Sequence, residues 1–261
     1  MKKSRKEKRK PTKSKRRKKP GKLARPKGSA REPFAKSQAN FSSDLSVNPH
    51  DLVSSSPELV NSAAEALKRG DPHEAFEICR ELLKLDPYHA GALNLAGVAA
   101  FQVGLAEEAL QLLETAVMQS PLDAEIYTNL GNVYAQLGRE DIAKSAYEQA
   151  MKVDPNYAEA FFNFGVFMEA TNHVEEAIKV LKKVLDQQPD HALAWYVLGN
   201  IYHKLSRLGE AQASLEAALK INPKLSLART NLAAILNEIG DFKGAVEEGQ
   251  RAIRSDPNLY E

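Results

Sequence analysis

The chain has 261 residues, 43% of them hydrophobic, and a formal net charge of +2. Its single cysteine, Cys79, excludes an intramolecular disulfide and a metal site built from several cysteines, and is typical of a reducing compartment. Because the sequence has no run of 18 apolar residues and no secretory signal pattern, it predicts neither a membrane span nor secretion.

The chain begins with a strongly basic segment. Residues 1–40 contain 18 Lys or Arg and two acids, whereas the remaining 221 residues contain 18 Lys or Arg and 32 acids. Dense like charge with few large apolar residues cannot bury enough surface to offset the entropy of ordering, so residues 1–52 are predicted to be a disordered tail and a Ser-rich linker. We expect the tail to bind a polyanion by counterion release; the alternatives are that it only solubilises the chain or contacts the chain's own acidic part. The residues expected to make the polyanion contact are Lys8, Arg9, Lys10, Lys15, Arg16, Arg17, Lys18 and Lys19.

A regular helical pattern follows the tail. Ser55, Pro57 and Glu58 predict a helix start, with Ser55 as the N-cap. Apolar residues then recur at intervals of three and four to the end of the chain, as on amphipathic helices. Prolines, which cannot continue a helix, recur every 34 residues, at Pro87, Pro121, Pro155, Pro189, Pro223 and Pro257.

A second break lies midway through each unit, seventeen residues before its proline. Gly70, Gly104, Gly138 and Gly240 occupy this place in four units, and Asn172 and Ser206 in the other two. A left-handed residue ends a helix there, which costs little for glycine and more for serine. Each unit is therefore predicted to be a helix, a tight turn, a second helix and a proline-marked turn.

Small residues recur where the two helices of a unit must approach closely. One ladder is Ala75, Ala109, Ala143, Ala177, Ala211 and Ala245, and the other is Gly97, Gly131, Gly165 and Gly199 with Ala63 and Ala233. The predicted fold class is all-α, an α-solenoid of six antiparallel helix pairs after a disordered basic tail.

These residues resemble the tetratricopeptide repeat (TPR) family, whose 34-residue pattern unit three follows almost completely. The matching residues are Tyr127, Leu130, Gly131, Tyr134, Gly138, Ala143, Tyr147, Ala150 and Pro155. The resemblance implies a right-handed superhelix over residues 56–259, with repeats at 56–89, 90–123, 124–157, 158–191, 192–225 and 226–259.

The first and last units depart from the pattern. In unit one, Ser62 replaces the Leu and Cys79 the second aromatic residue; in unit six, Arg229 and Gly249 replace the two aromatic residues. Because glycine weakens a helix, we expect the last hairpin to fray. Two explanations remain open: a partner covers unit six, or the chain is part of a longer product.

The sequence contains no catalytic or metal-binding signature. None of the six histidines has a metal-ligand spacing, and no phosphate-binding glycine loop is present. Acid pairs such as Glu107–Glu108 start second helices, where they complement the helix dipole. We therefore predict no enzymatic activity, no metal and no cofactor.

The resemblance implies that partner peptides bind in a concave groove lined by the first helices. Amide side chains there would hydrogen-bond an extended peptide backbone; alternatively, asparagine is simply a tolerated exposed residue next to Leu-Gly. The groove positions that match Lys and Arg of chaperone-binding relatives hold Thr128, Leu193 and Val197, so binding of chaperone tails is not predicted. The predicted groove residues are Asn61, Asn129, Asn132, Asn163, Tyr196, Asn200, His203, Lys204 and Asn231.

The resulting hypothesis is a protein–protein interaction scaffold, cytoplasmic, or nuclear in a eukaryotic cell, whose groove binds a protein or peptide partner. One alternative is the substrate-recognition arm of a glycosyltransferase-like enzyme, because the Asn column resembles the repeat arm of O-GlcNAc-transferase-like proteins. The other is a nucleic-acid or ribonucleoprotein accessory factor that acts through its basic tail.

Overall fold

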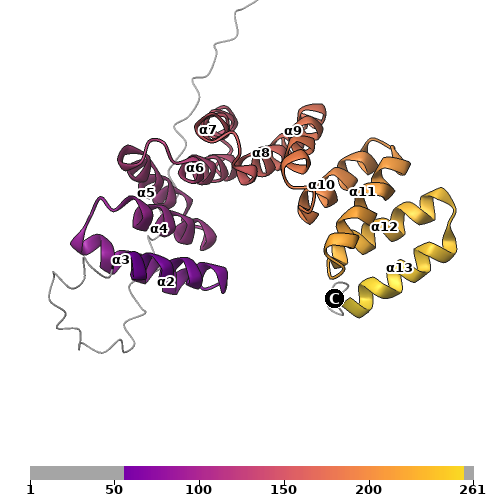
Figure 1. Cartoon of the computed structure of the whole chain (residues 1–261), viewed down its shortest axis with the longest axis horizontal. Helices are drawn as coiled ribbons and strands as arrows, with labels where there is room; N and C mark the ends of the chain where they lie inside the picture. The colour runs from indigo at the N-terminus through magenta and orange to yellow at the C-terminus, as the bar shows by residue number, and fades with distance from the viewer. Residues whose placement is uncertain (1–55, 256–261) are drawn as a thin grey trace, which may run out of the picture. The chain divides into compact units, whose positions relative to one another are not determined.

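The computed structural model describes residues 56–255, which are all-helical (Figure 1). The predicted disordered tail, the Ser55 cap and Pro257 lie outside these residues. The described helices are α2 (Ser56–Lys68), α3 (Pro72–Leu85), α4 (Ala90–Gln102), α5 (Ala106–Gln119), α6 (Ala124–Gln136), α7 (Glu140–Val153), α8 (Ala158–Ala170), α9 (Val174–Gln187), α10 (Ala192–Lys204), α11 (Leu208–Ile221), α12 (Ser226–Ile239) and α13 (Phe242–Ser255). They form six hairpins, each with a first helix (even label) and a second helix (odd label).

The turn inside each hairpin has the backbone conformation that the sequence predicts. Gly70, Gly104, Gly138 and Gly240 all have positive φ. Asn172 and Ser206, at the equivalent positions of repeats four and five, also have positive φ, at 64° and 58°. A residue in the left-handed conformation is therefore present in all six described hairpins, and in repeat five it is a serine.

In three of the described turns between hairpins, the polar residue before the proline organises the turn. The carboxylate of Asp154 accepts a hydrogen bond from the backbone N–H of Asn156 at 2.8 Å, and Asp86 and Asn222 make the same contact two residues ahead. This Asx turn leads the chain past the proline into the next first helix. The N-cap of that helix varies: Asp123 caps α6 through its carboxylate, and His89 and His191 cap α4 and α10 through Nδ1.

Within a hairpin, the helices meet where a glycine lies under a large side chain. A Cβ added to Gly131 would lie 2.6 Å from the Tyr147 ring, and one added to Gly199 would lie 2.7 Å from Leu215. Gly97 and Gly165 are filled in the same way by Leu113 and Leu181. The predicted close approach is confirmed, because even one methyl group does not fit at these sites.

The end repeats replace this pair by smaller partners on the second helix. At these positions repeat one has Ala63 with Cys79, and repeat six has Ala233 with Gly249. Where the first helix carries a methyl group, the second helix thus carries a smaller residue than the Leu or Tyr of the inner repeats. The position of Gly249 is left open, because no neighbouring atom lies within 4 Å of a Cβ built there.

Repeat six also replaces an aromatic contact by an ion pair. In repeat five, Trp195 Nε1 donates to the carbonyl of Pro189 at 2.9 Å; in repeat six, Arg229 Nε donates to the equivalent Pro223 carbonyl at 3.2 Å. The half-buried Arg229 guanidinium also pairs with Glu248 at 2.7 Å. In the described residues α13 is a continuous helix from Phe242 to Ser255, and the fraying expected of the last hairpin stays a prediction.

Each hairpin packs on the next through a shared core. A second helix contacts both its own first helix and the first helix of the following repeat, and consecutive first helices contact each other at every step. The core is rich in alanine and leucine, with large side chains such as Tyr147 and Met168 fully buried in the middle repeats. This nearest-neighbour packing is the basis of an α-solenoid.

Candidate peptide-binding face

The first helices α2, α4, α6, α8, α10 and α12 together form what we call the first-helix face. Because consecutive first helices contact one another, their side chains meet across repeat boundaries. The hydrogen bonds between them join residues 31 or 35 positions apart, that is, one repeat of 34 residues minus three or plus one.

Two of the predicted ladder asparagines are already bonded within the protein. Asn129 Nδ2 donates to Asn94 Oδ1 at 2.9 Å, and Asn231 Nδ2 donates to Asn200 Oδ1 at 2.7 Å. Asn94 in turn donates to Glu125 Oε1 at 2.8 Å. These amides therefore link adjacent repeats, and each keeps only part of its hydrogen-bonding capacity for a ligand.

The other two ladder positions are different. Asn163 on α8 is half-buried and Asn61 on α2 is exposed, and no side-chain hydrogen bond of either is found among the described residues. Asn132 accepts a hydrogen bond from the Tyr147 hydroxyl at 2.7 Å, inside its own repeat. The amides of Asn61 and Asn163 are thus the ones most available to a peptide.

The mixed patch on repeat five also bridges repeats. Lys204 pairs with Glu169 of the preceding repeat, and His203 Nε2 lies 2.8 Å from Glu238 of the following one. Tyr196, on the same helix, is half-buried. The cation of Lys204 therefore has a carboxylate partner that an acidic ligand would have to displace.

Sequence reasoning missed Asn94 and Glu125, which hold Asn129 in place. Asn94 is 6% exposed and lies one position before the ladder column in its repeat, where the other repeats have Val60, Thr128, Phe162, Tyr196 and Thr230. A buried amide among such residues requires a polar partner, which is the signal that could have identified it.

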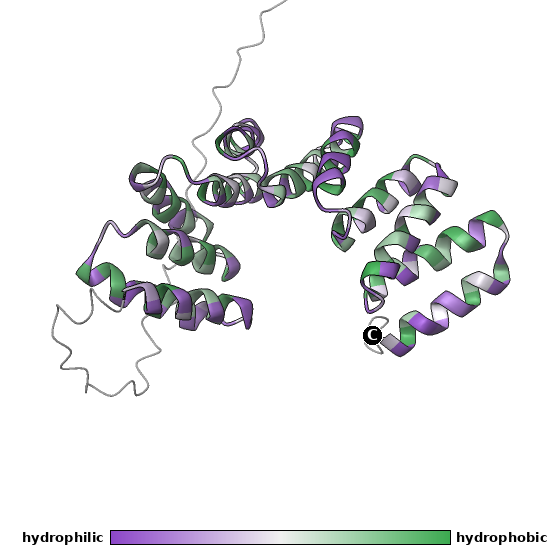
Figure 2. Cartoon of the chain, in the orientation of Figure 1, coloured by the Kyte–Doolittle hydropathy of each residue, from purple (hydrophilic) through white to green (hydrophobic). Residues whose placement is uncertain are grey.

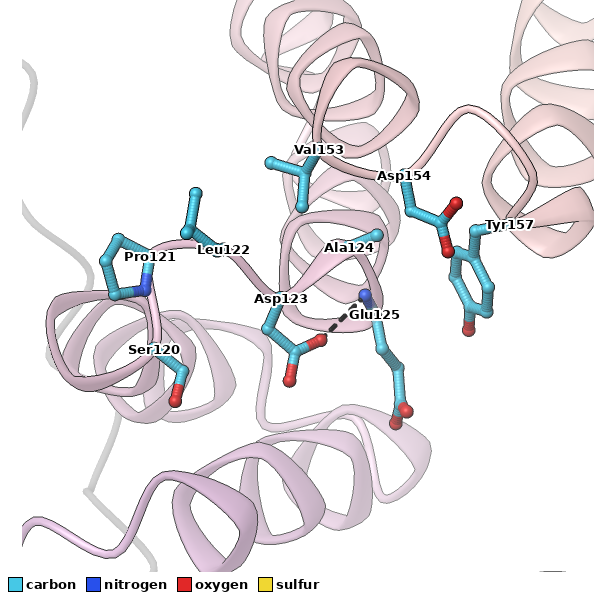
Figure 3. A pocket seen from close by; sticks show the side chains of 9 residues that line it. All are labelled: Ser120, Pro121, Leu122, Asp123, Ala124, Glu125, Val153, Asp154 and Tyr157. Atoms are coloured by element: carbon cyan, nitrogen blue, oxygen red, sulfur yellow. Dashed lines mark hydrogen bonds between the residues drawn. The ribbon is translucent and has the colours of Figure 1, made fainter.

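A cavity of about 740 Å³ lies at the turns that flank repeat three (Figure 3). Its walls carry the carboxylates of Asp123, Glu125 and Asp154, with apolar contributions from Leu122 and Val153. Burial, with these nearby carboxylates, raises the pKa of Tyr157 at its edge to about 12. Two of the carboxylates are occupied by backbone N–H groups, since Asp123 caps α6 and Asp154 forms an Asx turn.

No cluster of three or more potential metal ligands occurs in residues 56–255, and no helix in this range is long and apolar enough to cross a membrane.

Comparison with known families agrees with the repeat geometry. Two tetratricopeptide repeat models match residues 66–133 and 204–259, and the model of the cilia and flagella-associated protein 70 middle TPR-like domain matches residues 100–222. The chain is a tetratricopeptide repeat protein.

Solved structures with the same fold cover most of the repeats of this TPR protein. TTC0263, a thermophilic TPR protein of Thermus thermophilus, is 24% identical with a TM-score of 0.63, over 69% of this chain and 98% of its own. PilF of Pseudomonas aeruginosa is 16% identical with a TM-score of 0.67, over 77% and 92%. YrrB, described as a TPR protein with an unusual peptide-binding site, is 24% identical with a TM-score of 0.51, over 70% and 96%. No curated protein matches the chain significantly.

Proposed function

We propose that this TPR protein is a non-catalytic scaffold that holds an extended partner peptide along its first-helix face. The observation that carries the proposal is the column of asparagine side chains on four of the six described first helices, α2, α6, α8 and α12. Asn163 in this column is half-buried and makes no side-chain hydrogen bond among the described residues. The peptide-binding site named for YrrB supports the same use of the fold.

The asparagines differ in how much hydrogen-bonding capacity they have left for a peptide. Asn163 would offer its whole amide to a peptide backbone, whereas Asn129 and Asn231 would offer what remains after their bonds to Asn94 and Asn200. Asn94 and Glu125 would act as positioning residues, because they fix the rotamer of Asn129. We expect such contacts to favour an extended peptide with little dependence on its side chains.

The test is binding of the full chain to an array of extended synthetic peptides. Asn163→Ala should weaken the strongest signals about tenfold, a change typical for loss of an unshielded hydrogen bond in a binding site. Asn129→Ala should have a smaller effect on binding. The matched control is Gln119→Ala, which removes an exposed amide from a second helix and should change nothing. Equal binding by Asn163→Ala and the control would contradict the proposal.

The basic tail supports a second, separate contact with a polyanion. The supporting observation is its composition alone: eight Lys or Arg lie in residues 8–10 and 15–19, without an acid. Replacing these eight residues by Gln should remove binding to heparin or an RNA homopolymer, and should flatten its dependence on salt. Peptide binding by the first-helix face should survive that replacement, which separates the two contacts.

A further inference from the structure

The N-terminal end of the repeat array is polar. Glu58, Ser62 and Glu65 on α2 are exposed. At the equivalent positions of repeats two to six, the first helices carry only buried apolar residues, such as Ile126, Leu130 and Val133 in repeat three. The surface that would otherwise pack on a preceding repeat is therefore replaced by solvated side chains, like the outer face of a capping repeat.

The C-terminal end is apolar and uncovered in the described residues. Phe242, Val246 and Ile253 on α13 are 66%, 58% and 51% exposed. In repeat four, whose second helix packs against the next first helix, the equivalents of Val246 and Ile253 are Ile178 and Leu185, which are 6% and 7% exposed. Repeat six thus keeps the contact surface of an inner repeat, and α13 alternates hydrophobic and hydrophilic segments along its length (Figure 2).

This exposed surface has a self-complementary spacing. Its apolar residues and the open position at Gly249 form the α13 stripe, Phe242, Val246, Gly249 and Ile253, with separations of four, three and four residues. A spacing of this kind is unchanged when the helix is reversed. In an antiparallel pair of α13 helices about a two-fold axis, Phe242 of one copy therefore faces Ile253 of the other, and Val246 faces Gly249.

In the second of these pairs, the Val246 side chain of one copy faces the open position at Gly249 of the other. No atom lies within 4 Å of a Cβ built on Gly249, so the Val246 side chain of the second copy can enter there. The same contact occurs twice, once on each side of the axis, as an isologous interface requires. Knob-into-hole contacts at alternating separations of three and four residues are those of a short coiled-coil seam.

A head-to-tail arrangement of copies is disfavoured by charge. It would place the exposed carboxylates of Glu58 and Glu65, the second of which pairs with Lys68, against the apolar α13 stripe, where the loss of their hydration is costly. Such an arrangement would also continue into a filament, whereas the two-fold pairing closes.

We propose that two copies of this chain form a two-fold dimer through their α13 stripes, packed antiparallel. The dimer carries two first-helix faces and two basic tails, so a partner with repeated sites binds both with increased avidity. One helix from each copy makes a small interface, and we expect association at about 1–100 µM.

The first test is the mass of the full chain by sedimentation equilibrium over this concentration range. The expected result is a shift from 28.8 kDa to twice that mass. Val246→Glu places a charge in the seam and should give a monomer at all concentrations. Leu122→Glu is the control, because Leu122 is 85% exposed on an inter-repeat turn, and it should dimerise normally. A monomeric wild-type chain, or a dimer that survives Val246→Glu, would overturn the proposal.

The second test exchanges knob and hole. Gly249→Val alone sets valine against valine, and Val246→Gly alone sets glycine against glycine, so each should weaken the dimer. The double variant restores one valine facing one glycine on each side of the axis and should recover dimerisation. Circular dichroism of each variant checks that α13 still folds. A double variant no stronger than the singles contradicts the antiparallel pairing.

The third test distinguishes this pairing from other interfaces. Phe242→Cys chains mixed with Ile253→Cys chains should form a disulfide between copies under mild oxidation, whereas neither variant alone should do so. Cys79 is buried and can remain in place. Cross-linking in the single-variant samples, without an increase on mixing, would show a different arrangement of the helices.

Discussion

At the scale of single residues, equivalent positions show how a local exchange keeps a repeat folded. Arg229 donates a hydrogen bond to the Pro223 carbonyl, which is equivalent to the carbonyl that accepts from Trp195 one repeat earlier. Glu248 pairs with the Arg229 guanidinium and balances its charge. Ser206 adopts the positive φ that glycine adopts in four other repeats. Such substitutions are tolerated because one geometric requirement, a donor or a left-handed residue, is still met.

Cys79 gives the sharpest prediction at this scale. It is 1% exposed, and burial raises the pKa of its thiol from 9.0 to about 12. At pH 8 the folded chain should therefore hold a neutral thiol that reacts with iodoacetamide only when repeat one opens. The measurement is the alkylation rate against urea concentration, followed by mass spectrometry.

The control for this measurement is a Cys79→Ala chain that carries Ser145→Cys on an exposed position of α7. That thiol should react at the rate of a free peptide without urea. Native alkylation of Cys79 at the same rate would mean that the core of repeat one is open. Above pH 9 the unfolded chain loses a proton that the folded chain retains, so stability should fall as the pH rises toward 12.

At the scale of the helix pair, a matched pair of residues sets the distance between helices. Glycine on the first helix accompanies Leu or Tyr on the second, and alanine accompanies Cys or Gly. The second-helix residue is smaller wherever the first helix carries a methyl group, and at the Ala233–Gly249 position the lost side-chain volume is not replaced.

Gly199→Ala should lower the free energy of unfolding by about 1–3 kcal/mol, because its Cβ would lie 2.7 Å from Leu215. Leu215→Cys should also destabilise by leaving a cavity. The double variant copies the Ala63–Cys79 combination of repeat one, and should be more stable than the sum of the two changes predicts, by at least ~0.5 kcal/mol. Urea unfolding of the wild type, the two single variants and the double variant measures this coupling free energy.

Gly209→Ala is the matched control for the methyl group alone. Gly209 lies in the first turn of α11 with no atom within 4 Å of an added Cβ, so the substitution should not destabilise the chain. The packing argument fails if Gly199→Ala costs no more than Gly209→Ala does.

At the scale of the whole molecule, stability is carried by contacts between neighbouring repeats. Inner hairpins pack on two neighbours, whereas α2 and α13 belong to hairpins with a single described neighbour. The two ends also differ chemically, with exposed Glu58 and Glu65 at one and exposed Phe242 and Val246 at the other.

Hydrogen exchange should therefore follow position along the array. We expect the slowest amides in α7 to α10 and faster exchange in α2 and α13. Raising the protein concentration should slow exchange in α13, since dimerisation covers it, and leave α2 unchanged. Uniform exchange along the array would contradict nearest-neighbour stabilisation, and a concentration effect at α2 would contradict the assignment of the interface to α13.

The repeat, the hairpins and the left-handed turn residues could all be predicted from the amino-acid sequence. Each depends on local properties: the missing N–H of proline, the freedom of glycine and the spacing of apolar side chains. The helix pairs and the small-residue contacts followed from these properties, and the TPR fold was implied by the resemblance of the repeat to that family. The fold and the small-residue contacts are confirmed.

Which of the repeated side chains remain available to a ligand depends on contacts between repeats, and these could not be predicted from the sequence. Asn129 and Asn163 are equivalent in the sequence, yet Asn129 is bonded to Asn94 and Asn163 has no recorded partner in residues 56–255. The apolar residues of α13 likewise look like core residues until the absence of a following helix among the described residues exposes them. The physical reason is that hydrogen bonding and burial between repeats depend on side chains one repeat away, which no local pattern specifies.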